Sequence, residues 1–306
     1  MHVELLVVGA GPAGVSAALW ARALELDVLL LDGAPVPGGQ LHSVYFHPQD
    51  VPGLEQGDGP ALAASYARQL AAASVPLRTG CMAAALTPRH AEDGAIGVRL
   101  ASGDEIHARA VLVASGVRRR RLEVPGEREF DGRGVSFSAT RDRAELAGRT
   151  VIVIGGGDAA FENALLLAQA GSSVTLVVRE TPIARPEFRA RVAAARIPVL
   201  EQTRVLSFAG DTRARSVLVA GPEGERELLA EGFVVKIGVL PNTEWCRDVL
   251  ACDGDGYLRV DEWLATSLGG VWAAGDITRP QPPSIPVAIG QGAQAIAMIQ
   301  ADLRPR

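Results

Sequence analysis

The chain has 306 residues, of which 48% are hydrophobic and 21% are charged, with 34 glycines and a formal net charge of −5. This length allows two ordinary domains, each with its own core. The composition is typical of a soluble α/β protein and excludes a disordered or fibrous one. The negative charge argues against nucleic acid as a primary partner. No apolar stretch has transmembrane length and no cleavable signal precedes the first glycine turn, so we expect no membrane association and a cytoplasmic location.

The chain has three cysteines, and their spacing fits neither a metal site nor a disulfide framework. They are Cys81, Cys246 and Cys252. Such a pattern fits a reducing compartment. The default interpretation of each cysteine is therefore a small core residue without redox chemistry.

The first chemical signal is a glycine-rich turn between a strand and a helix. Residues 3–8 predict a strand, residues 12–25 predict a helix, and the sequence G-A-G-P-A-G joins the two. Gly9 permits a tight turn, Gly11 lets a pyrophosphate approach the backbone, and Gly14 allows close packing of helix on strand. The amino end of the helix then stabilises the anion. The pattern predicts a dinucleotide site.

The segments that follow extend this unit. Residues 27–31 predict a second strand that ends at Asp32, whose carboxylate suits the ribose hydroxyl groups of a dinucleotide. A helix is expected near residues 59–73. Short apolar runs then predict further strands at residues 97–100, 105–108 and 111–114.

Residues 117–127 predict a linker, because four arginines, Arg118–Arg121, are followed by V-P-G-E. Such a run can dock an acidic electron carrier and steer its approach. More often it is a solvated linker, and we favour that interpretation. The chain has a single lysine, Lys236, so codon bias also explains the many arginines.

The glycine pattern occurs a second time after this linker. The apolar run Val151–Ile154 precedes G-G-G-D-A-A, and a helix is expected over residues 159–170. Gly155 and Gly157 occupy the turn and approach positions, and Ala160 takes the close-packing position. Two such patterns in one chain predict electron transfer between two bound dinucleotides.

The remaining segments return the chain to its first unit. Strands are expected at residues 174–178, 217–219 and 233–237, and a final helix from about Gly290. The predicted fold class is α/β, with two Rossmann-like dinucleotide-binding domains of three layers, the second inserted into the first. The first domain comprises residues 1–117 and 239–306, and the second comprises residues 118–238.

Motifs over essentially the whole chain resemble the low-molecular-weight thioredoxin reductases, a family of flavoproteins. They are G-A-G-P-A-G, G-G-Q-L at 38–41, D-V-P-G at 50–53, G-R-G-V-S-F-S-A-T-R-D at 132–142, G-G-G-D-A-A, I-G-V-L-P-N-T and A-A-G-D-I. The resemblance implies FAD in the first site, NADPH or NADH in the second, and a homodimer. It also implies hydride transfer from the nicotinamide to the flavin, with the protein supplying orientation and electrostatics.

The resemblance also implies which residues bind the two nucleotides. For FAD they are Gly9, Gly11, Pro12, Ala13, Gly14, Asp32, Gly39, Gln40, Leu41, Asp50, Ala114, Gly116, Gly275, Asp276, Ile277 and Ala288. Among these, Asp32 would bind the adenosine ribose, Gln40 would approach the isoalloxazine, and Asp276 would bind the ribityl or diphosphate part. For the nicotinamide nucleotide they are Gly155, Gly157, Asp158, Ala159, Arg179 and Arg185.

One motif departs from the family in a way that bears on the reaction. Thioredoxin reductases carry C-A-T-C-D where this chain has S-A-T-R-D, so Ser138 and Arg141 replace the two redox cysteines. Neither serine nor arginine can form a disulfide. Asp142 matches the family's proton-handling acid. No catalytic residue is assigned beyond three candidates, which are Asp142, His42 and Tyr45, the last two in the loop expected beside the flavin.

Two other stretches are similar to a sister group, the thioredoxin-reductase-like ferredoxin/flavodoxin–NADP reductases, which also lack the cysteine pair. They are G-G-Q-L-H-S-V-Y with D-V-P-G, and I-P-V-A-I-G-Q-G-A-Q-A-I. The favoured hypothesis is therefore electron delivery from flavin to ferredoxin, flavodoxin or a small acceptor. Two alternatives stay open: a disulfide reductase without the usual dithiol, and a non-catalytic flavin or nucleotide sensor.

The nicotinamide preference has three interpretations. Arg179, Arg185 and Arg189 can bind a 2′-phosphate, because guanidinium groups match phosphate geometry. Glu180 can instead accept hydrogen bonds from ribose hydroxyls and favour NADH. The third interpretation is a set of solvated surface charges. We favour NADPH slightly.

Overall fold

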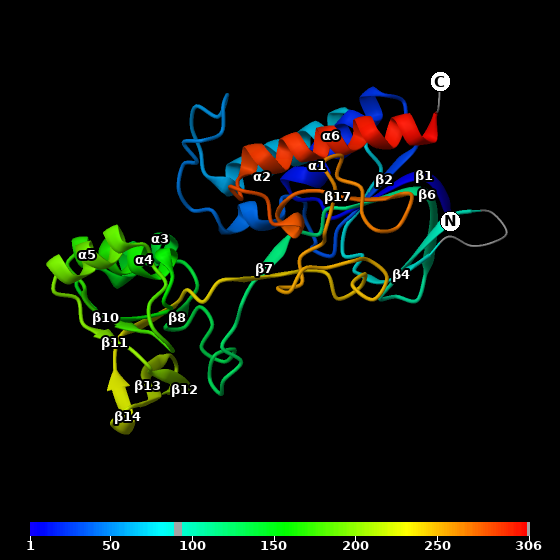
Figure 1. Ribbon diagram of the computed structural model, residues 1–306. Helices are drawn as coiled ribbons and strands as arrows, with labels where there is room; N and C mark the ends of the chain where they lie inside the picture. Colours follow the sequence, from blue (N-terminus) through cyan, green and yellow to red (C-terminus); the bar gives the residue numbers. More distant parts are fainter. Residues whose placement is uncertain (89–93, 305–306) are drawn as a thin grey trace. The chain divides into compact units, whose positions relative to one another are not determined.

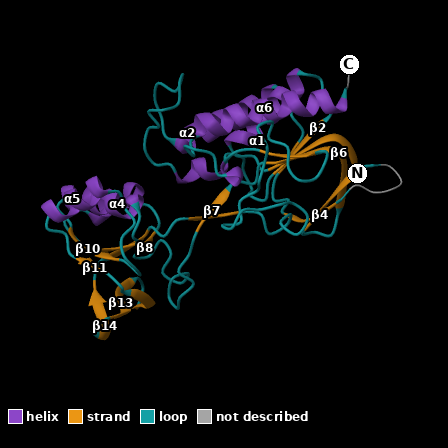
Figure 2. Cartoon of the chain, in the orientation of Figure 1, coloured by secondary structure: helices purple, strands orange, loops and turns teal. Residues whose placement is uncertain are grey.

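The computed structural model describes residues 1–88 and 94–304. The chain divides into two compact units, drawn in Figures 1 and 2. The first unit combines Met1–Arg118 with the residues from Leu240 onward, and the second is Arg119–Val239. The second unit is thus inserted into the first, and each boundary lies one residue from the position expected from sequence.

The first unit is built on a sheet that has seven strands among the described residues. Its strands, in order along the sheet, are β3 (Leu77–Arg78), β2 (Val28–Leu31), β1 (His2–Val8), β6 (Glu105–Val113), β5 (Ile96–Leu100) and β4 (Ala83–Thr87), with β17 (Val271–Ala273) also on β6. Strands β2, β1, β6 and β17 run parallel, whereas β5 and β4 pair antiparallel. The carboxyl ends of the parallel strands therefore meet at one edge.

Three helices cover one face of this sheet, as Figure 1 shows. They are α1 (Pro12–Ala23), α2 (Gly59–Ala72) and α6 (Ile285–Leu303), and two short 3₁₀ helices, η1 (Gly39–Ser43) and η2 (Asp276–Thr278), lie in the loops. Leu5, Val7 and Leu30 point toward the helices, while Leu6 and Val8 pack into a second cluster on the other face. The strands are apolar throughout because both faces are buried.

The second unit has three layers. Its central parallel sheet has the order β11 (Val199–Leu200), β10 (Ser173–Val177), β9 (Thr150–Ile154), β15 (Gly232–Val235) and β8 (Val135–Ser136). One face carries α3 (Ala139–Leu146), α4 (Asp158–Gln169) and α5 (Pro186–Ala194). The other face packs on an antiparallel sheet of β12 (Arg204–Gly210), β13 (Ala214–Gly221) and β14 (Gly224–Leu229). Phe208 and Phe233 meet edge to face across this second interface, with ring centroids 5.4 Å apart.

Three expectations about elements were wrong. Residues 105–108 and 111–114 are not two strands: β6 is continuous, because its backbone pairs with β1 past Arg109, whose side chain turns outward to Glu4 and Leu303. The final helix starts at Ile285 and not near Gly290. Ser284 caps it, its hydroxyl accepting from the Val287 amide at 3.4 Å, and Gly290 lies within it.

The expected linker also begins with a strand. Val117–Arg119 forms β7, which pairs with β16 (Val239–Pro241) on the returning segment. The arginines of this segment are largely engaged. Arg118 pairs with Glu244, and Arg121 pairs with Asp131 and lies 4.8 Å from the Phe137 ring centroid. These contacts favour the structural interpretation of the arginine run over a docking role.

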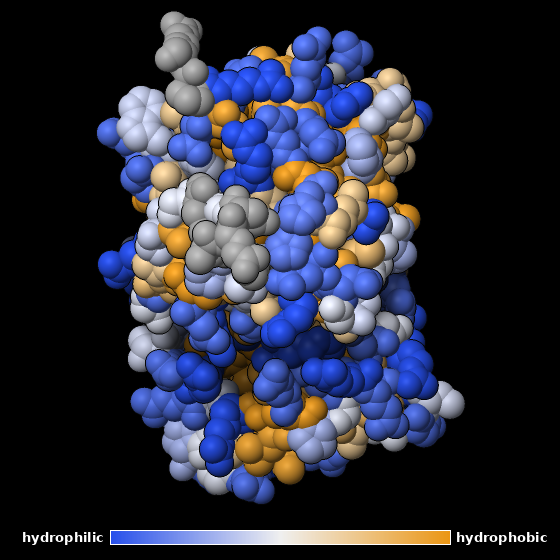
Figure 3. Space-filling model, turned by 90° about the vertical axis from the view of Figure 1, so that its right-hand side faces the viewer, coloured by the Kyte–Doolittle hydropathy of each residue, from blue (hydrophilic) through white to orange (hydrophobic). Residues whose placement is uncertain are grey.

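Hydrophilic side chains cover most of the face drawn in Figure 3, with apolar side chains in separate patches between them. None of the helices in the described residues is both long enough and apolar enough to cross a membrane. Among these residues no cluster of histidine, cysteine and acidic side chains could hold a metal ion.

Candidate functional site: two glycine turns and a lost dithiol

The first glycine turn lies at the carboxyl end of β1 and opens α1. Gly9 has φ +110°, and a Cβ on it would lie 2.3 Å from the Ala114 carbonyl oxygen. A Cβ on Gly14 would lie 1.7 Å from the Gly9 carbonyl oxygen. By contrast, a Cβ on Gly11 would meet nothing within 4 Å. Two glycines therefore allow the turn to close, and the third leaves open space at the helix amino end.

Asp32, at the end of β2, holds the neighbouring backbone. Its carboxylate accepts from the amide of Ala10 at 2.6 Å and from the amide of Ala34 at 2.7 Å. A carboxylate has about four acceptor positions, so lone pairs remain for further donors. Asp32 is thus fixed beside the glycine turn with capacity to bind hydroxyl groups.

The 3₁₀ helix η1 lies against the same turn. The Gly38 amide donates to the Ala10 carbonyl at 2.7 Å, and a Cβ on Gly39 would lie 3.1 Å from the Gly11 Cα. Gln40 donates from Nε2 to the Asp276 carboxylate at 3.3 Å. Burial raises the pKa of Asp276, and the Gln40 hydrogen bond partly opposes this.

The segment that leads into η2 also contacts α1. Gly275 has φ +81°, and a Cβ on it would lie 3.0 Å from the Ala13 Cβ and 3.8 Å from the Ala288 Cβ. Its amide donates to Gln291 Oε1 on α6 at 2.8 Å. Ile277 is fully buried in the core beneath. The segment around Gly275 therefore lines the same site as the first glycine turn, although the two are far apart in the chain.

The other residues expected at this site differ in their burial and in their hydrogen-bond partners. Leu41 is the buried residue of η1, and the Gly116 carbonyl accepts from the Asn242 amide at 3.0 Å. Asp50 is exposed in the long loop that follows η1. The Nε2 atom of His42 hydrogen-bonds with the Pro37 carbonyl oxygen at 2.9 Å. Tyr45 is half-buried in the loop. The open space above Gly11, the fixed Asp32 carboxylate and the half-buried Asp276 fit a dinucleotide such as FAD.

The second glycine turn repeats this geometry between β9 and α4. Gly155 has φ +142°, and a Cβ on it would lie 2.0 Å from the Lys236 carbonyl oxygen. A Cβ on Gly157 would meet nothing within 4 Å, and Ala160 is fully buried. Ala159 lies in the first turn of α4. The second unit thus has the same open space at a helix amino end.

Asp158, the first residue of α4, is held by Arg185. The Arg185 amide and Nε donate to its carboxylate at 2.7 and 2.6 Å. Hydrogen bonding from the Arg185 backbone lowers the pKa of Asp158. Arg185 also stacks near the Phe188 ring, with 5.0 Å to its centroid. Arg185 is therefore engaged within the protein, which leaves it less suited to a phosphate than its sequence position suggests.

Arg179 follows β10 and lines an open depression of about 410 Å³. The depression is lined by Arg179, Gln202, Arg204, Ala220, Gly221 and Pro222. Arg179 pairs with Glu180 at 3.0 Å, and both side chains are more than two-thirds exposed. Within the described part of the chain Arg204 forms no ion pair. Arg204 was not expected from sequence, because its approach to Arg179 depends on β12 lying beside the end of β10.

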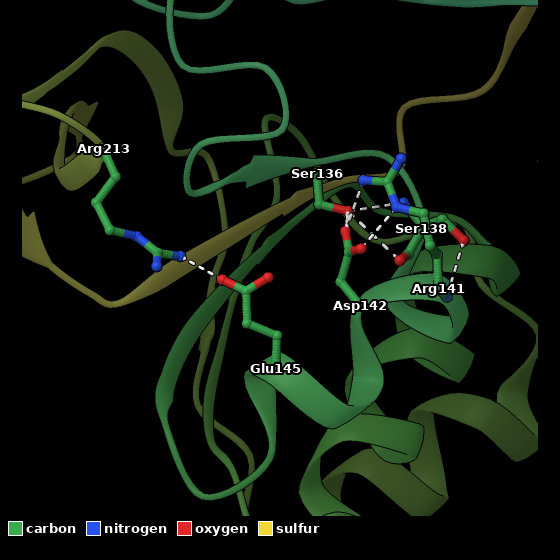
Figure 4. Close-up of polar contacts among 6 residues, drawn as sticks. All are labelled: Ser136, Ser138, Arg141, Asp142, Glu145 and Arg213. Atoms are coloured by element: carbon green, nitrogen blue, oxygen red, sulfur yellow. Dashed lines mark hydrogen bonds and ion pairs between the residues drawn. The ribbon is translucent and has the colours of Figure 1, made fainter.

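A polar network fills the positions at which the family carries its dithiol (Figure 4). Ser138 caps α3, its hydroxyl accepting from the Arg141 amide at 3.3 Å, and its own amide donates to Ser136 Oγ at 3.0 Å. Arg141 makes two hydrogen bonds to the Asp142 carboxylate, at 2.6 and 2.7 Å, and Ser136 donates a third. Burial would raise the pKa of Asp142, but the hydrogen bonds and charge of Arg141, with Ser136 and Arg119, lower it.

The cysteines offer no replacement for the dithiol. Burial raises the pKa of Cys246 to about 12, and burial also raises that of Cys252. Both are therefore thiols and not thiolates near neutral pH, and the thiolate is the nucleophilic form. Cys81 is half-buried and donates to the Thr79 carbonyl at 3.4 Å.

Two glycine turns of the dinucleotide-binding kind in one chain are typical of a nucleotide-dependent oxidoreductase. Comparisons with known proteins support this class. Residues 3–292 match the family model described as pyridine nucleotide-disulphide oxidoreductase. A ferredoxin–NADP reductase of Thermus thermophilus is 34% identical, covering 97% of this chain and 91% of that protein. A thioredoxin reductase of Listeria monocytogenes is 30% identical, covering 95% and 91%. The chain belongs to the pyridine nucleotide-disulphide oxidoreductase family.

A solved structure supports the same placement. The thioredoxin reductase of Lactococcus lactis superposes with a TM-score of 0.80 at 29% identity, covering 98% of this chain and 99% of that one. The expected fold class, family and oxidoreductase activity are thereby confirmed.

Several residues around the two turns were missed from sequence. They are Ser136, Gln202, Arg204, Lys236, Asn242 and Gln291. Apart from Ser136, which lies six residues before Asp142, each comes from a segment distant in the chain from the residue it contacts or neighbours. Two of them carried a signal: Lys236 is the single lysine in the chain, and Ser136 lies within the motif at 132–142.

Proposed function

We propose that the chain oxidises NAD(P)H through bound FAD and passes the electrons from the flavin directly to an acceptor, without a protein dithiol. The observation that carries this proposal is the network of Ser136, Ser138, Arg141 and Asp142, which occupies the dithiol positions with groups that cannot be oxidised to a disulfide. The raised thiol pKa of Cys246 and Cys252 supports it.

The first unit would hold FAD, with the diphosphate over Gly11 at the amino end of α1 and the adenosine ribose at Asp32. Gln40, Asp276 and the Gly275 segment would hold the remainder, together with the other residues expected from sequence. FAD supplies the ability to accept a hydride and release its electrons. The chain's own residues would contribute binding and orientation.

The second unit would hold the nicotinamide nucleotide over Gly157, and we propose NADPH as the preferred form. Arg179 and Arg204 line one depression at the end of β10, where a dinucleotide places its adenosine ribose. Two guanidinium groups suit a 2′-phosphate. The pairing of Glu180 with Arg179 reduces the ability of that carboxylate to bind ribose hydroxyls instead.

For the acceptor we propose an electron-carrier protein of the ferredoxin or flavodoxin kind, or a small acceptor. Support comes from the relative named ferredoxin–NADP reductase, together with the missing dithiol. A disulfide reductase is less favoured, because the thiols of Cys246 and Cys252 both have raised pKa values. The homodimer stays a prediction.

The test is anaerobic mixing of the FAD-loaded protein with NADPH and, separately, with NADH. We expect loss of the oxidised flavin absorbance with both nucleotides, and at lower concentration with NADPH. Gly157→Val is the matched control, because its side chain has room in the protein but would fill the space above the turn. It should retain FAD and lose reduction by nucleotide. No flavin reduction with either nucleotide would favour a sensor and overturn the proposal.

A further inference from the structure

Lys236 is unusual in both composition and place. The chain has 30 lysine and arginine residues, and Lys236 is the single lysine among them. It directly follows β15, and its amide donates to the Ile154 carbonyl at 2.7 Å. Its carbonyl oxygen lies against Gly155, where a Cβ would approach to 2.0 Å. Its backbone is therefore in direct contact with the second glycine turn.

The order of strands places Lys236 at the point where dinucleotides bind. From β9 the chain passes through α4 to β10 on one side, while β15 and then β8 lie on the other side of β9. In open parallel sheets, ligands bind outside the carboxyl ends of the strands at such a switch. The adenosine half would lie toward β10, and the nicotinamide half would then pass over the ends of β15 and β8. Lys236 is at the first of these ends, and Ser136 is at the second.

The surroundings of the Lys236 ammonium lack a close counter-charge. The charged groups that act on it are Arg119, on β7, and Glu162, on α4. The Arg119 charge also acts on Asp142, which pairs with Arg141. Within residues 1–88 and 94–304 Lys236 forms no ion pair. Burial and the Arg119 charge lower its pKa to about 8, with Glu162 opposing them.

We propose that Lys236 binds the nicotinamide-side phosphate of NAD(P)H and takes up a proton as it does so. This inference rests on the proposed function. An amine can lose its proton when it is half-buried without a partner, whereas a guanidinium cannot. A phosphate beside it supplies the missing negative charge and favours the protonated form. A lysine at this position can thus be neutral when the site is empty. It can be protonated, and pair with the phosphate, when the nucleotide is bound.

The test is isothermal titration calorimetry of the oxidised, FAD-loaded protein with NADP⁺ and with NAD⁺ at pH 8.5. Two buffers with different ionisation enthalpies report the number of protons bound with the nucleotide. We expect uptake of more than about half a proton, and roughly five- to tenfold weaker binding at pH 9.5 than at pH 8.5. The sign follows because the bound state holds the additional proton, so raising the pH opposes binding.

Three variants separate this role from a structural one. Lys236→Arg keeps the charge but cannot titrate, so it should bind without the proton uptake and with little change between the two pH values. Lys236→Met should lose the uptake and bind about tenfold more weakly at pH 7.5. Arg215→Gln removes an exposed charge from β13 in the same unit and should behave as the unchanged protein. Far-ultraviolet circular dichroism and FAD content establish that each variant is folded.

Proton uptake that persists in both Lys236 variants would overturn the inference, as would unchanged affinity of Lys236→Met for both nucleotides. If NADP⁺ or NAD⁺ binds and NADPH or NADH reduces the flavin while these variants match the unchanged protein, this inference alone fails. If neither oxidised nucleotide binds and neither NADPH nor NADH reduces the flavin, the proposed function fails with it.

Discussion

At the first glycine turn, Gly14 is required for the backbone to pack, whereas Gly11 leaves space for a ligand. Substitutions at the two positions should therefore have different effects. A Cβ at Gly14 would overlap the Gly9 carbonyl oxygen at 1.7 Å, whereas one at Gly11 meets only open space. We expect Gly14→Ala to lower the thermal unfolding midpoint and FAD content together, because the backbone must shift. Gly11→Ala should keep its apoprotein midpoint and lose affinity for FAD. Equal effects of the two substitutions on the apoprotein would contradict this account.

The Asp142 network contributes stability that depends on pH. Hydrogen bonds from Arg141 and Ser136 outweigh burial and lower the pKa of Asp142 below its unfolded value of 3.8. A lowered native pKa contributes stability above the unfolded value, and this contribution is lost as the pH falls through the native pKa. Asp142→Asn should therefore destabilise at pH 7.

Thermal unfolding at pH 7 and near pH 3 measures this effect. The difference between the unchanged protein and Asp142→Asn should shrink at the lower pH, because a growing fraction of Asp142 is then protonated and uncharged, as asparagine is at every pH. A difference that is constant across this range would mean that the carboxylate charge is not what stabilises the network.

Among the elements, α6 depends on a close approach to α1. A Cβ on Gly292 would lie 2.2 Å from the Ala13 carbonyl oxygen, while Gly290, two residues earlier, has nothing within 4 Å. Gly292→Val should destabilise the first unit by about 3 kcal/mol or more, because neither helix backbone can yield cheaply. Gly290→Ala should stabilise it by about 0.5–1 kcal/mol, since glycine is costly inside a helix. Thermal unfolding of both variants measures the contrast, and a harmless Gly292→Val would refute the packing.

The antiparallel sheet β12–β14 supplies one side of the depression beside β10. The Thr203 amide donates to the Val178 carbonyl at 3.0 Å, which holds Arg204 next to Arg179. We expect Arg204→Gln to raise the Kd for NADPH about tenfold and leave that for NADH nearly unchanged, because only NADPH carries the 2′-phosphate. Arg226→Gln, on the exposed strand β14, is the matched control. Equal losses for both nucleotides would show that Arg204 does not distinguish them.

The elements that sequence predicted well are those whose physical requirement is local. Each glycine turn contains a positive φ angle and close contacts that few residues other than glycine tolerate. Strands such as β1 and β9 are apolar because both of their faces are buried. The start of α6 was placed too late, at about Gly290, whereas the helix begins at Ile285 after the Ser284 cap. Gly292 lies within this helix, where it allows close packing on α1. The strand β14, G-E-R-E-L-L, was missed because its charged residues face solvent.

Ser136 lies only six residues before Asp142, because β8 leads directly into α3. Lys236 and Arg204 were missed for a different physical cause, which is sheet order. Lys236 reaches Gly155 because β15 pairs with β9. Arg204 meets Arg179 only when β12 lies beside the end of β10. Neither of these two contacts is visible in local spacing, because the pairing of distant strands creates them.

For the whole molecule, the central claim is that electrons leave the flavin without a redox-active pair of thiols. The most direct measurement is an anaerobic reductive titration of the FAD-loaded protein that counts reducing equivalents per flavin. The matched variant replaces Cys81, Cys246 and Cys252 with serine. We predict that a single two-electron equivalent of dithionite per FAD completes the reduction in both proteins. A second equivalent consumed by the unchanged protein and not by the variant would contradict the account.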